Sequence, residues 1–228
     1  MNIINMPAHS TNRWSRGGAK IQYIVLHYVG AVSTARNNGS YYGNTPRIGA
    51  SAHFFVDEYD VVASVPLAEK AGHCGVDYSG GKAPFWGKCT NANSIGIEMC
   101  CKKDAKGNWY IEPETVSKAV ALTRQLMAQY GLDADHVVRH YDVCWKRCPE
   151  PWVRDESQWK AFKRRLTEEE ENMVRYDTVQ QLPDYYRADI QKLIDLGHLQ
   201  GRNGGKLDLT EDMVRTLIIC GRMEGVLA

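Results

Sequence analysis

The stretch YIVLHYVG, residues 23–30, contains most of the first strand candidate in the sequence. Apolar residues occupy both alternating faces of residues 21–28, and most of them are β-branched or aromatic. This pattern predicts a strand that is covered on both sides, as in a sheet flanked by helices. His27 stands at the end of this apolar strand, where a polar ring needs a hydrogen-bond partner or a function.

Residues 94–101, SIGIEMCC, form a second strand candidate. Their alternation places Ile95, Ile97 and Met99 on one face and leaves Glu98 on the other. Elsewhere the pattern predicts two strands joined by a tight turn within 51–66, a short strand over 134–141, and helices near 33–42, over 112–131 and over 155–166.

A run of acidic residues, TEEEENM at 167–173, interrupts this order and predicts a linker. We therefore expect a first domain over 1–166 and a small, mainly helical module over 174–228. Two capped helices are predicted in that module, and a unit of this size is marginally stable alone, so it should dock or self-associate. Its expected helix contacts join Tyr185, Ile190, Leu193 and Ile194 to Met213, Leu217 and Ile218.

The composition of the 228 residues excludes several classes of protein. A net charge of +1 gives no electrostatic reason to expect nucleic acid as a partner. No apolar run is long enough for a membrane span, so membrane insertion is not expected either. The first eighteen residues, MNIINMPAHSTNRWSRGG, lack the apolar segment of a secretory signal.

The seven cysteines do not form the regular framework of a disulfide-stapled domain. Cys74 and Cys89 are the first pair to test for a bridge. We expect reduced, structural thiols at Cys74, Cys89, Cys100, Cys101, Cys144 and Cys220.

The motif RHYDVCWKRCPEP, residues 139–151, carries the strongest chemical signal. His140 and Cys148 flank a loop that is long enough to fold back on itself, and with His27 they would supply three zinc ligands and leave one position for water. Spacing alone leaves two alternatives open. His27 can be an ordinary core histidine, and Cys144 and Cys148 can be structural thiols or disulfide partners.

Glu98 and Lys146 extend this hypothesis. A carboxylate on an apolar strand is costly unless it has a partner or a function, and Lys146 lies two positions before Cys148. A metal-bound water, a carboxylate that accepts its proton and a cation that stabilises an oxyanion together make an amide hydrolase. The alternatives are a salt bridge at the strand edge for Glu98 and a solvated loop position for Lys146.

Four blocks in order, YIVLHYVG, SAHFFVD, NSIGIE and RHYDVCWKRCPEPW, resemble the zinc-dependent N-acetylmuramoyl-L-alanine amidases over residues 20–166. The resemblance implies an α/β fold with a central mixed sheet flanked by helices. It also implies one Zn²⁺ ion held by His27, His140 and Cys148, with Glu98 and Lys146 as the catalytic residues. The implied reaction cleaves the amide between N-acetylmuramic acid and L-alanine of the peptidoglycan stem peptide.

The chain differs from some family members at one position, and the roles of two matching histidines can be assigned in more than one way. Some members have a tyrosine where this chain has Ala52, so Glu98 must transfer protons alone. His53 and His73 match recurrent family histidines, which we assign to substrate binding, with structural support as the alternative. Aromatic residues of the predicted loops are further candidates for contact with sugar or peptide: Tyr41, Tyr42, Tyr78, Phe85 and Trp86.

The layout resembles a phage or prophage endolysin of a Gram-positive, clostridial host. Such a protein is synthesised in the cytoplasm and reaches the wall after a holin opens the membrane. We expect residues 174–228 to target the wall, with stabilisation or self-association as the alternative. The glutamate run before Met173 also raises the hypothesis of an internal translation start, against a plain acidic linker.

Two other functions remain open for the chain as a whole. One is a peptidoglycan-binding protein without catalysis. The other is a cysteine peptidase that uses Cys148 as its nucleophile.

Overall fold

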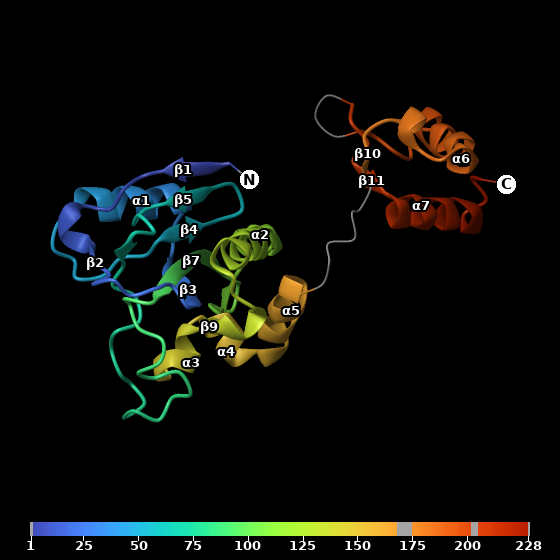
Figure 1. Cartoon of the computed structure of the whole chain (residues 1–228). Coiled ribbons are helices and arrows are strands. Elements are labelled where there is room, and N and C mark those ends of the chain that lie inside the picture. Colours follow the sequence, from blue (N-terminus) through green and yellow to red (C-terminus); the bar gives the residue numbers. More distant parts are fainter. Residues whose placement is uncertain (1, 168–174, 202–204, 228) are drawn as a thin grey trace. The chain divides into compact units, whose positions relative to one another are not determined.

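The computed structural model describes residues 2–167, 175–201 and 205–227, which divide into two compact units, Met1–Thr167 and Glu168–Ala228. Figure 1 shows the elements of both units, each of which is described below by itself. Most of the predicted acidic linker, and with it Met173, lies outside the described residues. Within the described ranges, no helix combines the length and apolarity that a bilayer crossing requires.

The first unit is built on one mixed sheet, as the sequence predicts. Strand β3 (Tyr23–Val32) lies parallel to β7 (Ser94–Lys103) on one side and to β9 (Val137–Arg139) on the other. The order across the sheet is β1 (Ile3–Asn5), β5 (Val61–Ala63), β4 (Phe54–Val56), β7, β3 and β9, with β8 (Trp109–Tyr110) paired to the end of β7. Among the described strands of this sheet, β5 runs antiparallel to β4, and β8 runs antiparallel to β7. A separate antiparallel ribbon pairs β2 (Trp14–Ser15) with β6 (Glu69–Lys70).

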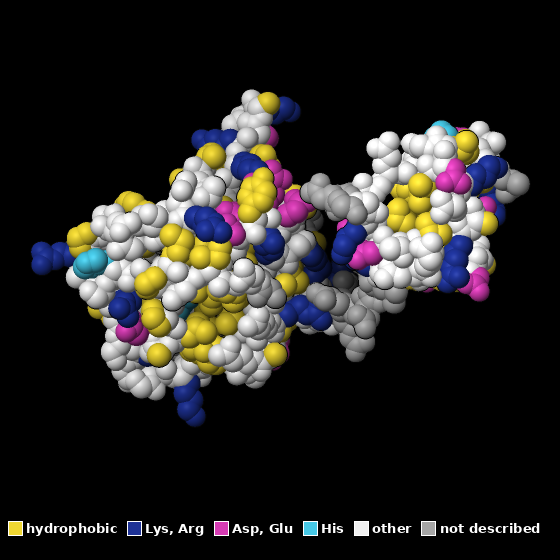
Figure 2. Space-filling view, turned by 90° about the horizontal axis from the view of Figure 1, so that it is seen from above, with side chains coloured by type: hydrophobic (Ala, Val, Ile, Leu, Met, Phe, Trp, Pro, Cys, Tyr) yellow, Lys and Arg dark blue, Asp and Glu magenta, His cyan; other side chains and the backbone are white. Residues whose placement is uncertain are grey.

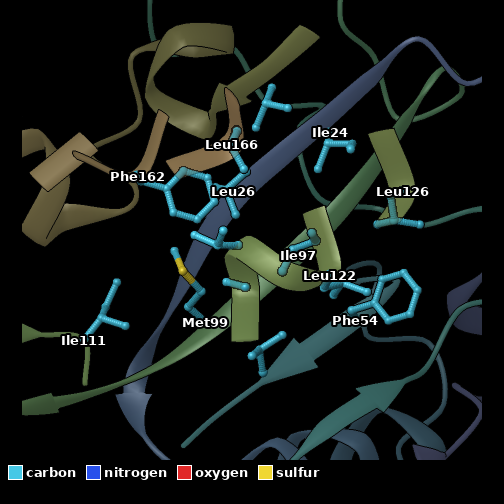
Figure 3. Close-up of a cluster of buried hydrophobic side chains, with 14 of the residues drawn as sticks. Ile24, Leu26, Phe54, Ile97, Met99, Ile111, Leu122, Leu126, Phe162 and Leu166 are labelled. Carbon is cyan, nitrogen blue, oxygen red and sulfur yellow. The ribbon is translucent and has the colours of Figure 1, made fainter. Parts of the chain in front are cut away.

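The main core lies on the face of the sheet that carries Ile24, Leu26 and Ile97. Helices α2 (Pro113–Tyr130) and α5 (Glu156–Thr167) cover this face, and Figure 3 shows their side chains closing over the strands. Pro113 begins α2, and Gly131 ends it with φ of +64°, a left-handed conformation that favours glycine. Core residues contributed by the two helices include Val120, Leu122, Leu126, Trp159, Phe162 and Leu166.

The opposite face of the sheet carries the polar residues of interest. It is covered by α1 (Ala35–Asn44) over Phe55 and Val62, and by α3 (His140–Cys144) together with the loop 73–93 over Val25 and Val138. The loop 73–93 contains neither helix nor strand. This face therefore combines rigid strands with irregular backbone, an arrangement that places functional side chains on a fixed support.

The segment 134–141 differs from the single strand that we predict. It contains a short 3-10 turn η2 (Ala134–His136), the three residues of β9, and the start of α3 at His140. Local caps cause these breaks: Asp133 accepts hydrogen bonds from the backbone of Asp135 and His136, and Asp142 accepts one from the Arg139 N–H. A further short helix, α4 (Glu150–Arg154), follows the motif.

The second unit is small and mainly helical. Helices α6 (Asp184–Asp195) and α7 (Glu211–Met223) pack with the 3-10 turn η3 (Val179–Gln181) and a two-stranded ribbon, β10 (Arg175–Tyr176) and β11 (Leu209–Thr210). The predicted core contact is wrong for Tyr185 and Met213, which are exposed because they lie off the buried stripe of each helix. The core consists of Tyr176, Leu182, Ile190, Leu193, Leu209, Val214, Ile218 and Leu227.

Charges of both signs are interspersed on the face shown in Figure 2, in keeping with the net charge of +1.

Candidate metal centre and catalytic site

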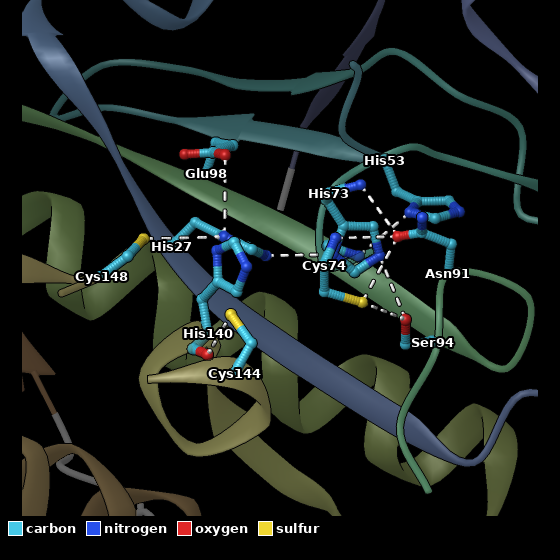
Figure 4. Close-up of polar contacts among 11 residues, drawn as sticks. His27, His53, His73, Cys74, Asn91, Ser94, Glu98, His140, Cys144 and Cys148 are labelled. Carbon is cyan, nitrogen blue, oxygen red and sulfur yellow. Dashed lines mark hydrogen bonds and ion pairs between the residues drawn. The ribbon is translucent and has the colours of Figure 1, made fainter. Parts of the chain in front are cut away.

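His27, His140 and Cys148 meet at one point, although 121 positions separate His27 from Cys148. One ligand atom of each lies within 4.8 Å of the other two, and all three residues are buried (Figure 4). His27 comes from the middle of β3, because that strand continues to Val32, past the end that the sequence predicts. His140 is the first residue of α3, and Cys148 follows that helix.

The backbone after α3 turns sharply to bring Cys148 back beside His140. Trp145 ends the helix with φ of +62°, a left-handed conformation that is uncommon for a side chain of this size. The loop closes when the Tyr141 N–H donates to the Cys148 carbonyl at 2.8 Å and the Cys148 N–H donates to the Lys146 carbonyl at 2.7 Å. This closure explains how two residues eight positions apart share one site.

The protonation of the three donors suits a metal ion. Burial, reinforced by His140 and His73, holds the pKa of His27 well below its usual value. Burial lowers the pKa of His140 to about 3, so both rings are neutral at neutral pH and have a free lone pair. Burial raises the pKa of the Cys148 thiol, and a cation must displace its proton on binding.

Unsatisfied buried atoms give an independent test of whether these residues fit a metal. Among the described residues, neither ring nitrogen of His140 has a hydrogen-bond partner, and Oε2 of Glu98 has none. Buried polar atoms without partners are rare in folded proteins and destabilise them. Two imidazoles and a thiolate are also a typical donor set for zinc, so the residues present fit the Zn²⁺ ion that the sequence implies.

A hydrogen-bonded relay fixes the tautomer of His27. The Ser94 hydroxyl donates to the Thr90 carbonyl at 2.6 Å, so it must accept from His73 Nε2–H at 3.1 Å. His73 Nδ1 is then an acceptor, and His27 Nε2–H donates to it at 3.0 Å. His27 Nδ1 is left without a proton and faces Cys148 Sγ at 3.7 Å, so the lone pair of this nitrogen is free to bind a metal.

Packing beside this relay requires glycine at position 96. A Cβ atom on Gly96 would lie 2.7 Å from the His73 ring. Glycine therefore lets the His73 ring lie directly on β7. The role of Ser94 was not predicted, although the sequence offers one signal for it: a small polar residue at the head of an apolar strand, two positions before this glycine.

His53 lies in the interior rather than at a surface where substrate could reach it. Its side chain has no exposed surface, and its Nδ1 accepts from the Gly96 N–H at 3.0 Å. Its Nε2 lies 3.1 Å from the Glu69 carbonyl and 2.8 Å from the Arg16 guanidinium. These contacts favour a role for His53 in supporting the site, rather than the predicted contact with substrate. The hydrogen bonds of His73 favour the same role for that residue.

Glu98 lies next to the three donors on the same face. Its Oε1 is 3.9 Å from His27 Nδ1, and a fifth of its side-chain surface is exposed, against 2% for His27. Burial raises the pKa of Glu98 to about 8, and the charge of Lys146 acts in the opposite direction. Lys146 itself is exposed, and its charge also lowers the pKa of His27 and His140.

The predicted loop aromatics divide into two groups. Tyr42 stacks on Phe55 and Phe85 packs edge-on against Tyr23, so these two residues serve the core. Tyr41 and Tyr78 are exposed, and Trp86 is half-buried. Only the last three remain candidates for substrate contact.

Comparisons with known proteins show which family the chain resembles. A family model described as N-acetylmuramoyl-L-alanine amidase matches residues 17–151. A probable N-acetylmuramoyl-L-alanine amidase of Bacillus licheniformis is 37% identical over 162 residues, and the amidase BlyA of Bacillus subtilis (strain 168) is 35% identical over 166 residues. Each match covers 68% of this chain and 44% of the relative, so the chain spans less than half the length of these proteins.

Solved structures show the same fold. The catalytic domain of XlyA matches with a TM-score of 0.57 and 26% identity, over 73% of this chain and 99% of that one. PlyL matches with a TM-score of 0.59 and 22% identity, over 74% of this chain and 98% of that one. The chain belongs to the N-acetylmuramoyl-L-alanine amidase family.

Proposed function

We propose that the chain is a zinc-dependent amidase that cleaves the bond between N-acetylmuramic acid and L-alanine of the peptidoglycan stem peptide. The observation that carries this proposal is the meeting of His27, His140 and Cys148 beside the partly exposed side chain of Glu98. The family match and the amidases among the relatives support the choice of bond.

When bound by these ligands, a zinc ion supplies a Lewis acid and lowers the pKa of its water. Glu98 accepts the proton of the attacking water and later delivers one to the leaving amine. Its pKa of about 8 in the metal-free protein keeps the carboxyl protonated at neutral pH, and a nearby cation lowers that pKa, so that Glu98 becomes a base. Lys146 contributes a positive charge that stabilises the oxyanion of the tetrahedral intermediate.

Substrate reaches the site from the side of Glu98, which is more exposed than His27. A depression of about 240 Å³ lies further along the same strands, and it is lined by Thr34, Asn37, Cys100 and Lys102 among others. Cys100 follows Glu98 on the same face of β7, because side chains of a strand alternate. We place the stem peptide along this face, with Trp86 of the loop 73–93 as a further contact.

The two rival functions fit the geometry less well. A cysteine peptidase needs a reactive thiolate, whereas Cys148 is 2% exposed and burial raises its pKa. A binding protein without catalysis does not need three metal donors and an adjacent carboxyl with an unpaired oxygen.

At the level of the cell, we propose that the chain acts on the wall as an endolysin, released from the host cytoplasm through a holin lesion. The likeness to the catalytic domain of XlyA and to a mutant endolysin from Bacillus subtilis supports this role. The module over 174–228 would target the wall, with self-association as the competing role. A clostridial host remains a prediction.

Digestion of purified cell walls tests the activity directly. The zinc-loaded chain should release stem peptides that begin with a free L-alanine amine, identified by mass spectrometry, and removal of zinc by a chelator should abolish release. Re-addition of zinc should restore it. Activity that survives chelation would indicate a cysteine peptidase, and wall binding without new amino termini would indicate a binding protein.

A further inference from the structure

Cys74 and Cys89 form a thiol pair outside the metal centre. They lie near the two ends of the loop 73–93, and both are 2% exposed in a small core with Val25, Val138 and Val143. Both residues are free cysteines of this one buried cluster. Asn91, two positions after Cys89, accepts hydrogen bonds from the Cys74 N–H at 2.8 Å and from the Cys74 thiol at 3.3 Å, so the segment that follows Cys89 packs directly against Cys74.

We propose that Cys74 and Cys89 form a reversible disulfide that closes the loop 73–93 in an oxidising environment. The oxidant is a small-molecule disulfide such as oxidised glutathione. The Cys74 thiolate attacks one of its sulfur atoms and expels one glutathione thiolate, which takes up a proton. Cys89, after loss of its proton, displaces the second glutathione from Cys74, so that one S–S bond is exchanged and two thiols are released.

The surroundings of the pair assign these roles. The hydrogen bond from Cys89 lowers the pKa of Cys74 and raises that of Cys89, so Cys74 is the better attacking group. Val76 and Lys88, close to the two cysteines in sequence, are exposed, and the segment between the two cysteines has no regular secondary structure. Local opening of such a segment lets a small oxidant reach a buried thiol.

A closed loop would act on the metal centre through Asn91. The Asn91 side-chain oxygen accepts hydrogen bonds from the His73 N–H at 2.9 Å and from the Cys74 N–H at 2.8 Å. His73 in turn accepts from the zinc ligand His27. The disulfide would therefore hold the backbone of His73 in the position that orients His27. This inference does not depend on the activity of the site.

The test equilibrates the zinc-loaded full chain in glutathione buffers that range from fully reduced to fully oxidised. Disulfides are located by peptide mapping after the free thiols are blocked, and unfolding is followed by calorimetry. Cys89→Ser removes the pair, and Cys220→Ser, at an exposed cysteine, is the matched control. Cys144→Ser provides a second control. Cys144 is a buried thiol, and the charge of Cys74 raises its pKa.

Oxidation should produce one intramolecular disulfide between Cys74 and Cys89 and raise the unfolding temperature of the first unit by about 5–10 °C. Reduction should reverse both changes. The shift should persist in Cys220→Ser and Cys144→Ser and vanish in Cys89→Ser. The proposal is overturned if Cys74 and Cys89 stay reduced in the most oxidising buffer, or if Cys74 pairs with Cys144. It is also overturned if oxidised Cys89→Ser shows the same shift.

Discussion

His27 and Glu98 are direct partners in the parallel pairing of β3 with β7, and Oε1 of Glu98 lies 3.9 Å from Nδ1 of His27. The register of two core strands therefore sets the distance between a metal donor and the carboxyl that we assign as the base. A slip of one residue would turn Glu98 into the main core, beside Ile24 and Leu26 of β3, and would turn Ile97 and Met99 out of that core. The hydrophobic packing of that core thus protects the catalytic geometry.

Replacement of Glu98 tests its assignment as the base. Glu98→Gln should lower turnover on cell walls by about 10²–10⁴-fold, because the amide cannot accept the water proton. Zinc content, measured by atomic absorption, should remain at one ion per chain. Glu114→Gln, at an exposed glutamate of α2, is the control and should leave turnover unchanged. Near-normal turnover of Glu98→Gln would remove Glu98 from the mechanism.

The pH dependence of the stability of the metal-free protein should show the raised pKa of Glu98. Burial raises the pKa of Glu98 to about 8 from a value of 4.5 in the unfolded chain. Between these pH values the folded state binds more protons, so the contribution of Glu98 to the free energy of unfolding falls as the pH rises. Unfolding midpoints of the wild type and Glu98→Gln should therefore agree near pH 4 and diverge toward pH 8, with the variant more stable.

The comparison is made on chelated protein, and the difference between the two chains cancels the titration of the histidines. Bound zinc favours the carboxylate, so zinc-loaded protein should show a smaller divergence. Parallel curves from pH 4 to pH 8 in the chelated protein would show that Glu98 is not held in its protonated form.

The thiolate ligand can be tested against a neighbour in the same motif. Cys148→Ser should lose stoichiometric zinc, because the thiolate is one of only three protein ligands. Cys144→Ser should keep it, since Cys144 hydrogen-bonds the His140 carbonyl and does not belong to the donor cluster. Competition with a chromogenic chelator measures both affinities. Equal zinc affinity of the two variants would contradict the ligand assignment.

The hydrogen bonds that run from His27 through His73 to Ser94 should strengthen zinc binding. His73→Leu and Ser94→Ala each break the chain that fixes the His27 tautomer, and each should weaken zinc binding by about 10–100-fold. His136→Leu, at an exposed histidine paired with Asp133, should bind zinc as the wild type does. Unchanged affinity in both relay variants would reduce His73 and Ser94 to packing roles.

The sequence predicts those parts of the fold whose signals are local. The alternation in SIGIEMCC places Ile95, Ile97 and Met99 in the core, and Pro113 and Gly131 mark the ends of α2, as the structure confirms. The strand β1 was missed because its three residues show no period of their own. They are ordered by pairing with β5, almost sixty positions away.

The candidate site also has parts that the sequence predicts and parts that it does not. The residue types of the RHYDVCWKRCPEP motif, together with His27, suggest a metal site. Spacing alone left a core histidine and structural thiols as alternatives, because it does not give the distance between His27 and Cys148, and the family resemblance favoured the metal. The interruption of 134–141 by caps was missed because Asp133 and Asp142 act through side-chain hydrogen bonds that compete with strand pairing. The hydrogen bond between His73 and Ser94 joins side chains whose orientation depends on Gly96. The spacing of apolar residues in the sequence gives no sign of such a contact.

X-ray absorption spectroscopy at the zinc edge, on the purified chain loaded with one equivalent of zinc, identifies the atoms that bind the metal. We expect a single zinc environment with one sulfur at about 2.3 Å, two imidazole nitrogens at about 2.0 Å and one further oxygen. The sulfur contribution should disappear in Cys148→Ser. A zinc environment without sulfur, or one with two sulfurs, would contradict the assignment of His27, His140 and Cys148 as the metal centre.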